Sequence, residues 1–404
     1  YYKPNNMISI SNLVFRMKKN AVGLATIAIL SSMVLVTLVG AASIYAGKKD
    51  YLASSAPHDY SVTGTNVDLT STRKAMDDFL VQTGNQVNRK VEASYLYFGI
   101  KEQEKNKLTI FSENERKVLP KSIFLVFSQS TYKQLTGKDL NLTSNQVGLF
   151  TKNKTLKDQK SLSVNSQTYQ IHDSLNDFLK GKIPNLFTII VSDYSYLVVP
   201  DMDDFQESIK GTATTQATYV GVNVKDPSHD AKKNSDLLDK ITDKETQQLA
   251  GQTTGLPKSY FTANSRYDAE GMVNGFVGGT FFIGIFLSII FMLGTVLVIY
   301  YKQISEGYED RERFVILQKI GLDDLQVKQT IGKQVLTVFF LPLIFAFIHL
   351  AFAYHMISLI VRIIGVLNPS LMLVVTIIVC GVFFLAYILV FALTSRSYRR
   401  IVSM

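Results

Sequence analysis

Histidine stands directly before aspartate at three places in the chain, and this pair of residue types can ligate a metal ion or activate a nucleophile. The three pairs are His58-Asp59, His172-Asp173 and His229-Asp230. A metal site needs several ligands close together, as when a His-x-x-x-His spacing puts two imidazoles on one helix face. No such spacing joins these pairs, which lie far apart in the sequence. We therefore expect surface or turn positions for them, with no metal site and no catalytic residue.

Two Gly-Lys sequences are the other candidates for chemistry, because a phosphate-binding loop also places lysine after glycine. Gly137-Lys138-Asp139 and Gly181-Lys182-Ile183 lack an earlier glycine at the required spacing and have no Ser or Thr after the lysine. We therefore expect the chain to hold no cofactor and not to hydrolyse ATP itself. The single cysteine, Cys380, lies in an apolar run and is interpreted as packing or lipid-facing filler.

The elements that must carry any function are indicated by four stretches without Asp, Glu, Lys or Arg. These stretches are residues 20–47, 271–301, 334–361 and 363–395. A helix that crosses the hydrocarbon core needs about 20 apolar residues. We therefore predict four transmembrane helices; a buried soluble helix, or a signal peptide at the first stretch, are the alternatives. His349 and His355 in the third stretch are roughly 240° apart around a helix, so they cannot share a ligand, and we interpret them as interfacial groups.

Basic residues flank the first and last of these stretches. Arg16, Lys18 and Lys19 precede the first, and Arg396, Arg399 and Arg400 follow the last. Since positive residues favour the cytoplasmic side, both termini are predicted to lie in the cytoplasm of a cell membrane. Most of the net charge of +9 lies close to the membrane stretches, because acidic and basic residues nearly balance in residues 48–270. We interpret the excess of positive charge as a signal that sets the orientation of the membrane helices and attracts anionic membrane lipids. We do not interpret it as a sign of nucleic-acid binding.

The predicted fold is a membrane protein of four transmembrane α-helices, with a large extracellular α+β domain inserted between the first and the second. Its expected parts are a cytoplasmic interfacial amphipathic helix at 1–20, transmembrane helices at 21–47, 271–301 and 334–362, the extracellular domain at 48–270, a cytoplasmic helical hairpin at 302–333, an outer turn with the last transmembrane helix at 363–395, and a basic tail at 396–404.

Both helical and strand periodicities occur in residues 48–270, which is the reason for the α+β prediction. Short β-branched and aromatic runs predict strands at 93–99, 107–111, 186–192, 196–199 and 217–224, with a hairpin at 161–172. Helical spacing predicts helices at 71–83, 202–209 and 230–250. Ser71 is expected to cap the first of these helices, and Asp201 or Asp203 the second.

Glycine and proline mark special places in the membrane part. Gly271, Gly275 and Gly279 recur every four residues, which predicts close helix packing in lipid; a flexible joint is the compatible alternative. Pro342 predicts a kink in the third transmembrane helix, and Pro369 is expected near the first position of the fourth.

Residues 302–333 mix acidic and basic side chains with an apolar stripe. The spacing of Phe314 and Leu317 predicts a helix over 309–320 that ends at Gly321, and Asp323 is expected to cap a second helix. Such a charged hairpin suits docking onto a cytoplasmic partner. A solvated connecting loop is the alternative.

Three segments of the membrane part resemble a known family. Arg313-Phe314-Val315-Ile316-Leu317-Gln318-Lys319-Ile320-Gly321 is similar to the cytoplasmic signature of FtsX-like ABC transporter permeases. Residues 300–311 (YYKQISEGYEDR) and 15–31 (FRMKKNAVGLATIAILS) resemble the BceB-type permeases of bacitracin and peptide-antibiotic resistance. The layout of one span, a large outer domain and three further spans agrees with that family, whose permeases have ten spans, so this chain would supply the C-terminal part.

The resemblance implies a function and a set of partners. A separate ABC ATPase subunit dimer, which binds ATP and Mg, would move the coupling residues Glu306, Gly307, Tyr308, Glu309, Arg311, Arg313, Phe314, Leu317 and Gly321. The outer domain would engage an antimicrobial peptide antibiotic or its lipid-carrier complex, and a membrane histidine kinase would couple transport to two-component signalling in a Gram-positive bacterium. Two alternatives are an FtsX-family permease that exports a lipid or lipoprotein or activates a peptidoglycan hydrolase, and a stand-alone membrane receptor. The ligand-binding residues are not indicated.

Overall fold

The computed structural model describes residues 4–115, 120, 122–184, 191, 193–250, 258–319, 324–364 and 368–402. The chain forms two compact units. One comprises Tyr1–Lys48 with Gly275–Met404, and the other comprises Lys49–Asn274. We call them the helical unit and the β unit, and each is described by itself.

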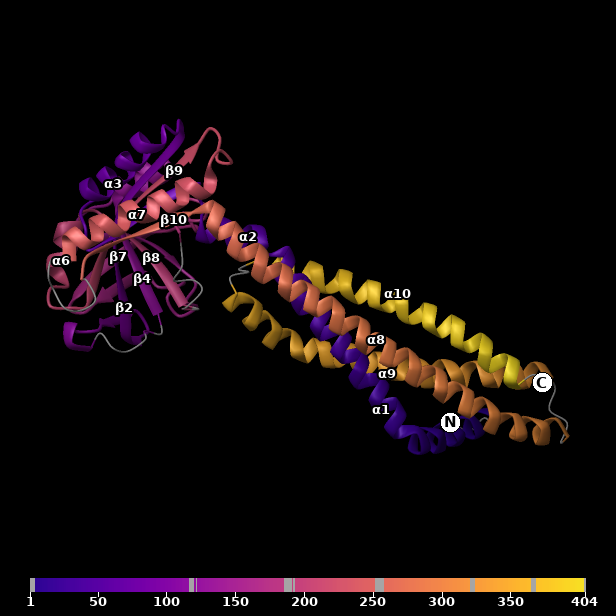
Figure 1. Cartoon of the computed structure of the whole chain (residues 1–404). Helices are drawn as coiled ribbons and strands as arrows, with labels where there is room; N and C mark the ends of the chain where they lie inside the picture. Colours follow the sequence, from indigo (N-terminus) through magenta and orange to yellow (C-terminus); the bar gives the residue numbers. More distant parts are fainter. Residues whose placement is uncertain are drawn as a thin grey trace. The chain divides into compact units, whose positions relative to one another are not determined.

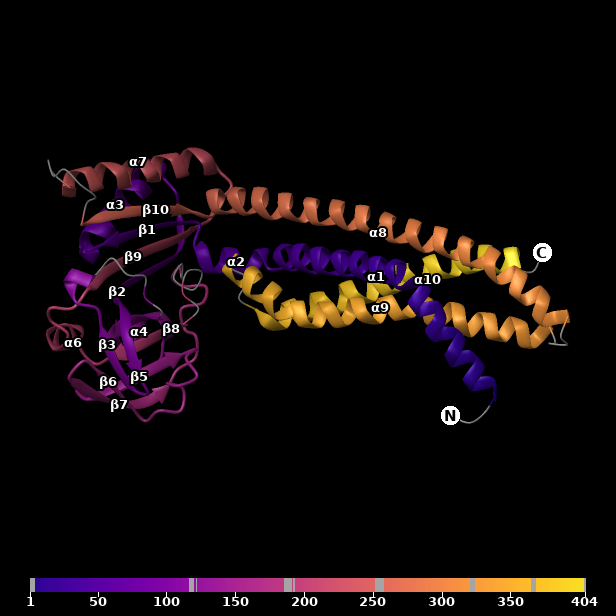
Figure 2. The same ribbon diagram turned by 90° about the horizontal axis from the view of Figure 1, so that it is seen from below.

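The helical unit consists of long apolar helices that lie side by side (Figures 1 and 2). They are α1 (Pro4–Ala46), α8 (Arg266–Lys319), which enters from the β unit, α9 (Asp324–Ile363) and α10 (Pro369–Val402). Four segments in them are long and apolar enough to cross a membrane: Ala21–Ala46, Arg266–Glu309, Phe339–Arg362 and Pro369–Arg396. The charge-free runs thus coincide with helices that can span a bilayer.

The start of α10 is explained by the residue types at that end of the helix. Asn368 begins α10, because its side-chain oxygen accepts hydrogen bonds from the backbone N–H groups of Ser370 and Leu371, at 3.1 and 3.2 Å. Pro369 is the first residue of that helix, where its missing N–H costs nothing. Pro342 lies inside α9, which continues through it.

Single helices run through two of the expected divisions. α1 extends from Pro4 to Ala46 and includes most of the expected interfacial helix at 1–20 as well as the first span. α8 extends from Arg266 to Lys319 and joins the second span to the first half of the expected hairpin. The β unit also does not lie directly between the first two helices of the chain, because a short helix, α2 (Lys48–Ser55), follows α1 after Gly47.

The β unit is a ten-stranded sheet, part of which closes on itself. Its strands are β1 (Tyr60–Thr65), β2 (Val87–Glu104), β3 (Lys107–Ile110), β4 (Ser122–Ser128), β5 (Gln146–Thr151), β6 (Ser161–Val164), β7 (Gln167–Ser174), β8 (Asp193–Val199), β9 (Thr214–Val224) and β10 (Tyr260–Ser265). The order is β10-β1-β9-β2-β3-β6-β7-β5-β8-β4, and β4 also pairs with β2. The strands from β2 to β4 in this order therefore form a closed barrel, and β9, β1 and β10 extend β2 as an open sheet.

The side chains of β2 alternate between the two faces of the strand, and one of these faces lines the barrel. Leu96, Phe98 and Ile100 point into the barrel, where they pack with Phe124 of β4 and with Phe205 of α6 (Met202–Ser208). The remaining helices of the unit are α3 (Leu69–Thr83), α4 (Gln129–Thr136), α7 (Ala231–Ala250) and the short 3-10 helix η1 (Glu113–Glu115). Helices α3 and α7 cover one face of the open sheet through a separate apolar cluster that contains Tyr60, Phe79, Val220 and Leu238.

Most expected elements of this unit are present, with corrections at their ends. Asp68 caps α3, and the backbone N–H of Ser71 donates to its carboxylate at 2.9 Å, so the expected cap at Ser71 is wrong. Asp201 caps α6, as expected. Asn165 has a φ of 52° and forms the turn of the β6–β7 hairpin. The strand expected at 186–192 falls almost entirely outside the described residues.

Candidate functional site

The far end of α8 is the segment for which the sequence predicts a partner contact. Tyr308, Glu309 and Arg311 are exposed there, and Gly307 is buried. The side chains of Glu306, Arg313, Phe314 and Leu317, although their backbone is helical, and all of Gly321 lie outside the described residues. The helix ends at Lys319 and the next begins at Asp324, close to the expected turn. The proposed coupling contact at these residues stays a prediction.

Helices α1 and α8 approach each other closely at Gly284. A Cβ atom added to Gly284 would collide with the Cβ of Ala41, so only glycine permits this approach. One turn further along each helix, Thr37 Oγ1 and Ser288 Oγ share a hydrogen bond of 2.9 Å. The rings of Tyr45 and Phe281 stack at 4.5 Å on the other side of the crossing. These contacts hold α1 and α8 together along one seam.

The glycine face that the sequence predicts on α8 does not contain Gly284. Gly271, Gly275 and Gly279 are exposed, and a Cβ on any of them would meet no described atom within 4 Å. Their role in packing stays a prediction, while the close approach of α1 and α8 occurs at Gly284. Sequence reasoning missed Gly284 because it stands outside the four-residue repeat.

Helix α9 makes polar and aromatic contacts with both of its neighbours. Ser32 Oγ of α1 lies 3.0 Å from Nδ1 of His349 on α9. The hydroxyl of Tyr387 on α10 donates to the backbone carbonyl of Phe339 at 2.8 Å, and the two rings meet edge to face at 4.8 Å. The Tyr387 contact is buried and pairs a polar group inside an apolar bundle, where an unpaired one is costly, whereas the Ser32–His349 contact is exposed.

His58 is the one His-Asp histidine that the structure buries, contrary to the expected surface position. It is 2 % exposed, and its Nδ1 lies 2.7 Å from the hydroxyl of Tyr219. Gly221 makes room for the ring, since a Cβ there would lie 2.5 Å from that nitrogen. Burial, with Arg89 and Arg266 nearby, lowers the pKa of His58 to about 4. The imidazole is therefore neutral at physiological pH, and its surroundings suit a structural role.

The other candidates for chemistry have local structural roles. His172 and His229 are exposed, and His229 Nε2 lies 3.8 Å from the Asp230 carboxylate. Gly137 ends α4 with a φ of 74°, and Lys182 donates from Nζ to the carbonyl of Leu135 at 2.5 Å. Among the described residues, no group of three His, Cys, Asp or Glu side chains could hold a metal ion.

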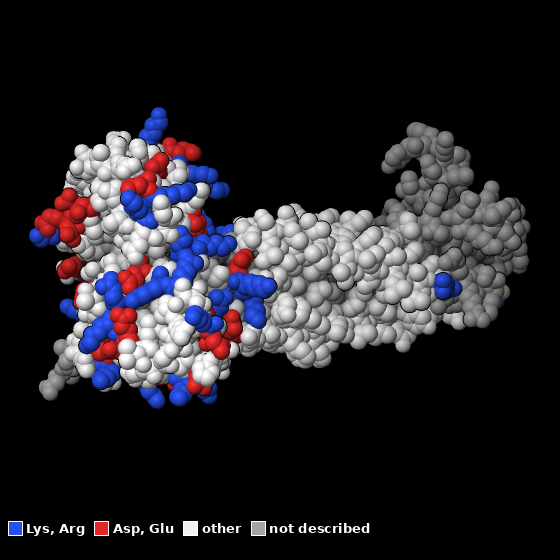
Figure 3. All heavy atoms as spheres, turned by 90° about the horizontal axis from the view of Figure 1, so that it is seen from above, with Lys and Arg blue, Asp and Glu red and all other residues white. Residues whose placement is uncertain are grey.

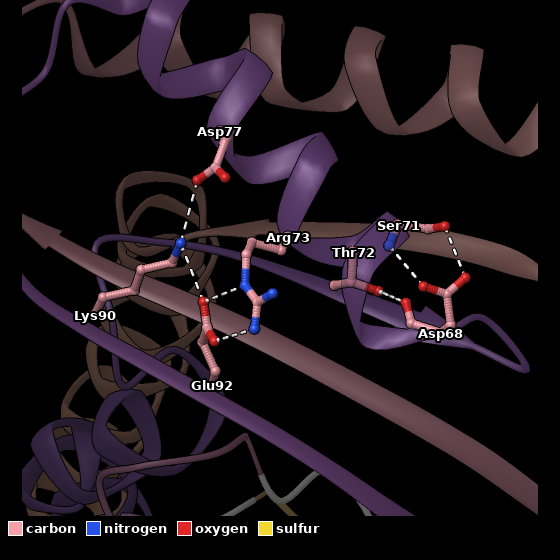
Figure 4. Close-up of polar contacts among 7 residues, drawn as sticks. All are labelled: Asp68, Ser71, Thr72, Arg73, Asp77, Lys90 and Glu92. Carbon is pink, nitrogen blue, oxygen red and sulfur yellow. Dashed lines mark hydrogen bonds and ion pairs between the residues drawn. The ribbon is translucent and has the colours of Figure 1, made fainter.

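Charge is distributed very unevenly over the described surface. Figure 3 shows Lys, Arg, Asp and Glu mixed over the β unit and almost none on the described face of the helices. One ordered group joins α3 to β2 (Figure 4): Arg73 donates to both carboxylate oxygens of Glu92, at 3.0 and 2.8 Å. Lys90 lies between Glu92 and Asp77, at 3.1 and 3.2 Å. The hydrogen bonds from Arg73 are the largest cause of the lowered pKa of Glu92.

The described surface of the β unit is hollowed at several places, and two of the hollows are larger than the others. One of about 690 Å³ is lined by residues of α3 and α7 that include Lys232, Lys233 and Lys240. A second of about 590 Å³ opens at one end of the barrel beside Tyr169 and Phe205. Neither holds a cluster of side chains with perturbed pKa values that would indicate a reaction.

Three known proteins that are similar to this chain are all named as permeases. No protein-family model matches the chain. The chain is 23 % identical over 372 residues, 87 % of its length and 52 % of the other protein's, to the ABC transporter permease protein YxdM of Bacillus subtilis. It is 21 % identical over 368 residues, 87 % of its length and 51 % of the other protein's, to the bacitracin export permease protein BceB of the same organism. A segment of 121 residues, 30 % of this chain and 18 % of the other protein, is 31 % identical to the uncharacterized ABC transporter permease YvcS, also of B. subtilis.

The chain thus spans about half the length of the two relatives that it matches over most of its own length. Its helices are long and apolar enough to cross a membrane, and the relatives are named as permeases. Over most of its length the chain is thus similar to proteins named as permeases, and its described residues include helices that could cross a membrane.

Proposed function

We propose that this chain is the part of an ABC transporter permease that senses cell-wall-active peptide antibiotics and confers resistance to them. A separate cytoplasmic ATPase dimer supplies the energy, and the β unit faces outward, where it engages the peptide or its lipid-carrier complex. The similarity to a bacitracin export permease over 87 % of the chain is the observation that carries the ligand class. A membrane histidine kinase is the proposed signalling partner.

Helix α8 supports the coupling part of this proposal. It has 54 residues without a break, which corresponds to a length of about 80 Å. Its first turn is fixed within the β unit, because Ser265 Oγ accepts from the backbone N–H of Asp268 at 3.1 Å and donates to the Asp268 carboxylate at 2.7 Å. The backbone N–H of Arg266 also donates to the carbonyl of Asp59 at 2.8 Å. One continuous element therefore extends from the β unit to the proposed ATPase contact.

The ATPase contact is tested by charge reversal in the full-length permease. We expect Glu309→Lys combined with Arg313→Glu to abolish co-purification of the ATPase, because a docking surface of mixed charge loses complementarity when its signs are reversed. Lys233→Glu, an exposed change in the β unit, is the matched control and should leave co-purification unchanged. Undiminished recovery of the ATPase with the double variant would refute the contact.

The ligand class needs a separate measurement on the assembled complex in lipid nanodiscs. Bacitracin-like and nisin-like peptides should bind the complex and change its rate of ATP hydrolysis. Proline at Gly294, within α8, should interrupt the helix and remove the peptide effect while the ATPase still binds. If neither peptide binds a normally assembled complex, the antibiotic function is wrong, whatever the outcome of the charge reversal.

A further inference from the structure

Pro342 weakens one turn of α9. The described segment of this helix that could cross a membrane begins at Phe339, three residues before the proline. Proline has no backbone N–H, so the carbonyl of Val338, four residues earlier, receives no helical hydrogen bond from this position, and the proline ring crowds that carbonyl. Helices bend at such positions, and in a membrane no water replaces the lost bond. The turn at residues 338–342 is therefore a place where α9 can change its direction.

A side chain of the neighbouring helix bonds to this weakened turn. Tyr387 of α10 donates from its hydroxyl to the backbone carbonyl of Phe339 at 2.8 Å. That carbonyl is next to the one that the proline leaves without its helical bond. Tyr387 is 1 % exposed, so the hydrogen bond is shielded from water. A buried tyrosine needs a partner for its hydroxyl, and this one finds it in the backbone of the turn. The bond is satisfied only while the Phe339 carbonyl points toward α10.

Aromatic rings surround the same turn. Phe339 packs edge to face against Tyr387 and Phe391, with ring centroids 4.8 and 4.7 Å apart. The ring of Phe340 lies 5.5 Å from that of Phe391. Among the described residues, every ring contact between α9 and α10 involves Phe339 or Phe340. Helix α10 therefore holds α9 at one level, immediately before the proline.

The part of α9 after the proline is attached to a different helix. Ser32 Oγ of α1 lies 3.0 Å from Nδ1 of His349, and α9 packs extensively along α1. Ala346 and Leu350 of this part are buried. The two sides of the weakened turn thus have different anchors, α10 on the side before Pro342 and α1 on the side after it. Such an arrangement allows one side to move while the other stays in place.

We propose that Pro342 is a hinge in α9 and that the hydroxyl of Tyr387 is the latch that fixes the angle of this hinge. While the hydrogen bond is made, the Phe339 carbonyl is held toward α10 and the turn keeps one angle. When the bond breaks, the part of α9 from Asp324 to the hinge changes its direction, and the part after Pro342 stays against α1. The latch is a property of the helical unit, and it does not depend on the ligand or the ATPase of the proposed function.

The test measures the angle of α9 by pulsed electron paramagnetic resonance on the full-length permease in lipid nanodiscs. Every native cysteine, Cys380 included, is replaced by alanine. One pair of spin labels is placed at Leu336, before the hinge, and at Leu373, near the start of α10. The control pair is Phe352, after the hinge, with Leu389 of α10. All four labelled side chains are exposed. Only the first pair spans the hinge, so only its distance reports the angle.

Tyr387→Phe removes the latch and keeps the ring. Leu336 stands six residues, or about 9 Å, before Pro342, so a change of about 20° in the hinge moves this label by about 3 Å. We expect the variant to populate a second Leu336–Leu373 distance. The ratio of latched to open molecules should fall about three- to tenfold, which is the effect of losing one hydrogen bond between membrane helices. The control pair should be unaffected.

Pro342→Ala distinguishes a latch from ordinary packing. Alanine restores the backbone N–H and closes the helix, so the second distance should be absent in this variant. Tyr387→Phe combined with Pro342→Ala should then have no effect, because no hinge remains for the hydroxyl to hold. The proposal is overturned if Tyr387→Phe leaves the Leu336–Leu373 distances unchanged. It is also overturned if this change has the same effect with proline and with alanine at position 342, or if it alters the control pair as much as the first pair.

Discussion

Acidification from pH 7 to pH 5 should destabilise the β unit through His58. The ring is buried against Tyr219, and its pKa in the folded chain is about 4 instead of 6.5. Because the folded-state pKa is the lower one, the unfolded chain takes up the proton first as the pH falls. The stability that neutral His58 provides is thus fully present above pH 6.5 and is lost as the pH falls toward 4.

The size of the loss follows from the two pKa values. A difference of about 2.5 units corresponds to about 3 kcal/mol once both states have titrated, and to about 2 kcal/mol at pH 5. Solvent screening reduces this free-energy difference only slightly, because the His58 side chain is 2 % exposed. Most carboxylates with a lowered pKa, such as Glu92, affect stability only at lower pH. The interval from pH 7 to pH 5 therefore isolates the histidine.

Urea unfolding of the purified chain in detergent measures this loss. Tyrosine fluorescence reports on the β unit, since the chain has no Trp and several of its Tyr residues are buried there. With a slope of about 2 kcal/mol per molar urea, the midpoint should fall by about 1 M between pH 7 and pH 5. His58→Gln should lose most of this pH dependence, whereas His172→Gln, at an exposed position, should retain it.

The reasoning would be refuted by either of two results. One is a wild-type midpoint that is the same at pH 7 and pH 5. The other is a His58→Gln variant that keeps the whole shift, because the proton would then bind elsewhere.

Three further substitutions test other contacts. Glu92→Gln should lower the stability of the β unit by about 1 kcal/mol, because Arg73 and Lys90 lose their charged partner; an unchanged urea midpoint would contradict this. Gly84→Ala should cost about 1 kcal/mol, since Gly84 has a φ of 65° with open space around it, and Gly84→Asn should cost less; equal midpoints for the two variants would contradict the backbone argument. Gly284→Leu should lower the thermal stability of the helical unit by about 1–3 kcal/mol by separating α1 from α8, whereas Gly279→Leu should not; equal melting temperatures would show that the contact with Ala41 does not matter.

Charge and hydropathy were sufficient to predict the helical unit, because a membrane helix must satisfy its own backbone and exclude charge over its whole length. The ends were harder to predict. Nothing in residues 266–319 marks a boundary between a span and a cytoplasmic helix, since Glu306 and Arg311 are as compatible with a helix as the apolar residues before them. The prediction therefore divided one helix into two parts.

The β unit was predictable as short strands and helices but not as a barrel. Closure depends on β2 pairing with both β4 and β9, and on parallel pairs such as β4 with β8, which are distant in sequence. Local periodicity does not specify partners of this kind. The burial of His58 depends on a similar long-range contact, with Gly221, and for that reason its sequence context predicted a surface position.

The pairing of β1 has a consequence for the order in which the β unit can form. Both neighbours of β1, β9 and β10, come more than a hundred residues later, and Tyr60 lies opposite Ser265 at the end of the unit. During synthesis β1 therefore has no partner strand until almost the whole unit has been made. Its pairing with β9 and β10 is a late step that joins segments distant in sequence. The same arrangement returns the chain to its starting point, so the unit from β1 to β10 enters and leaves through adjacent strands. Such an insert can be replaced by another of different size while the ends of the flanking chain stay together.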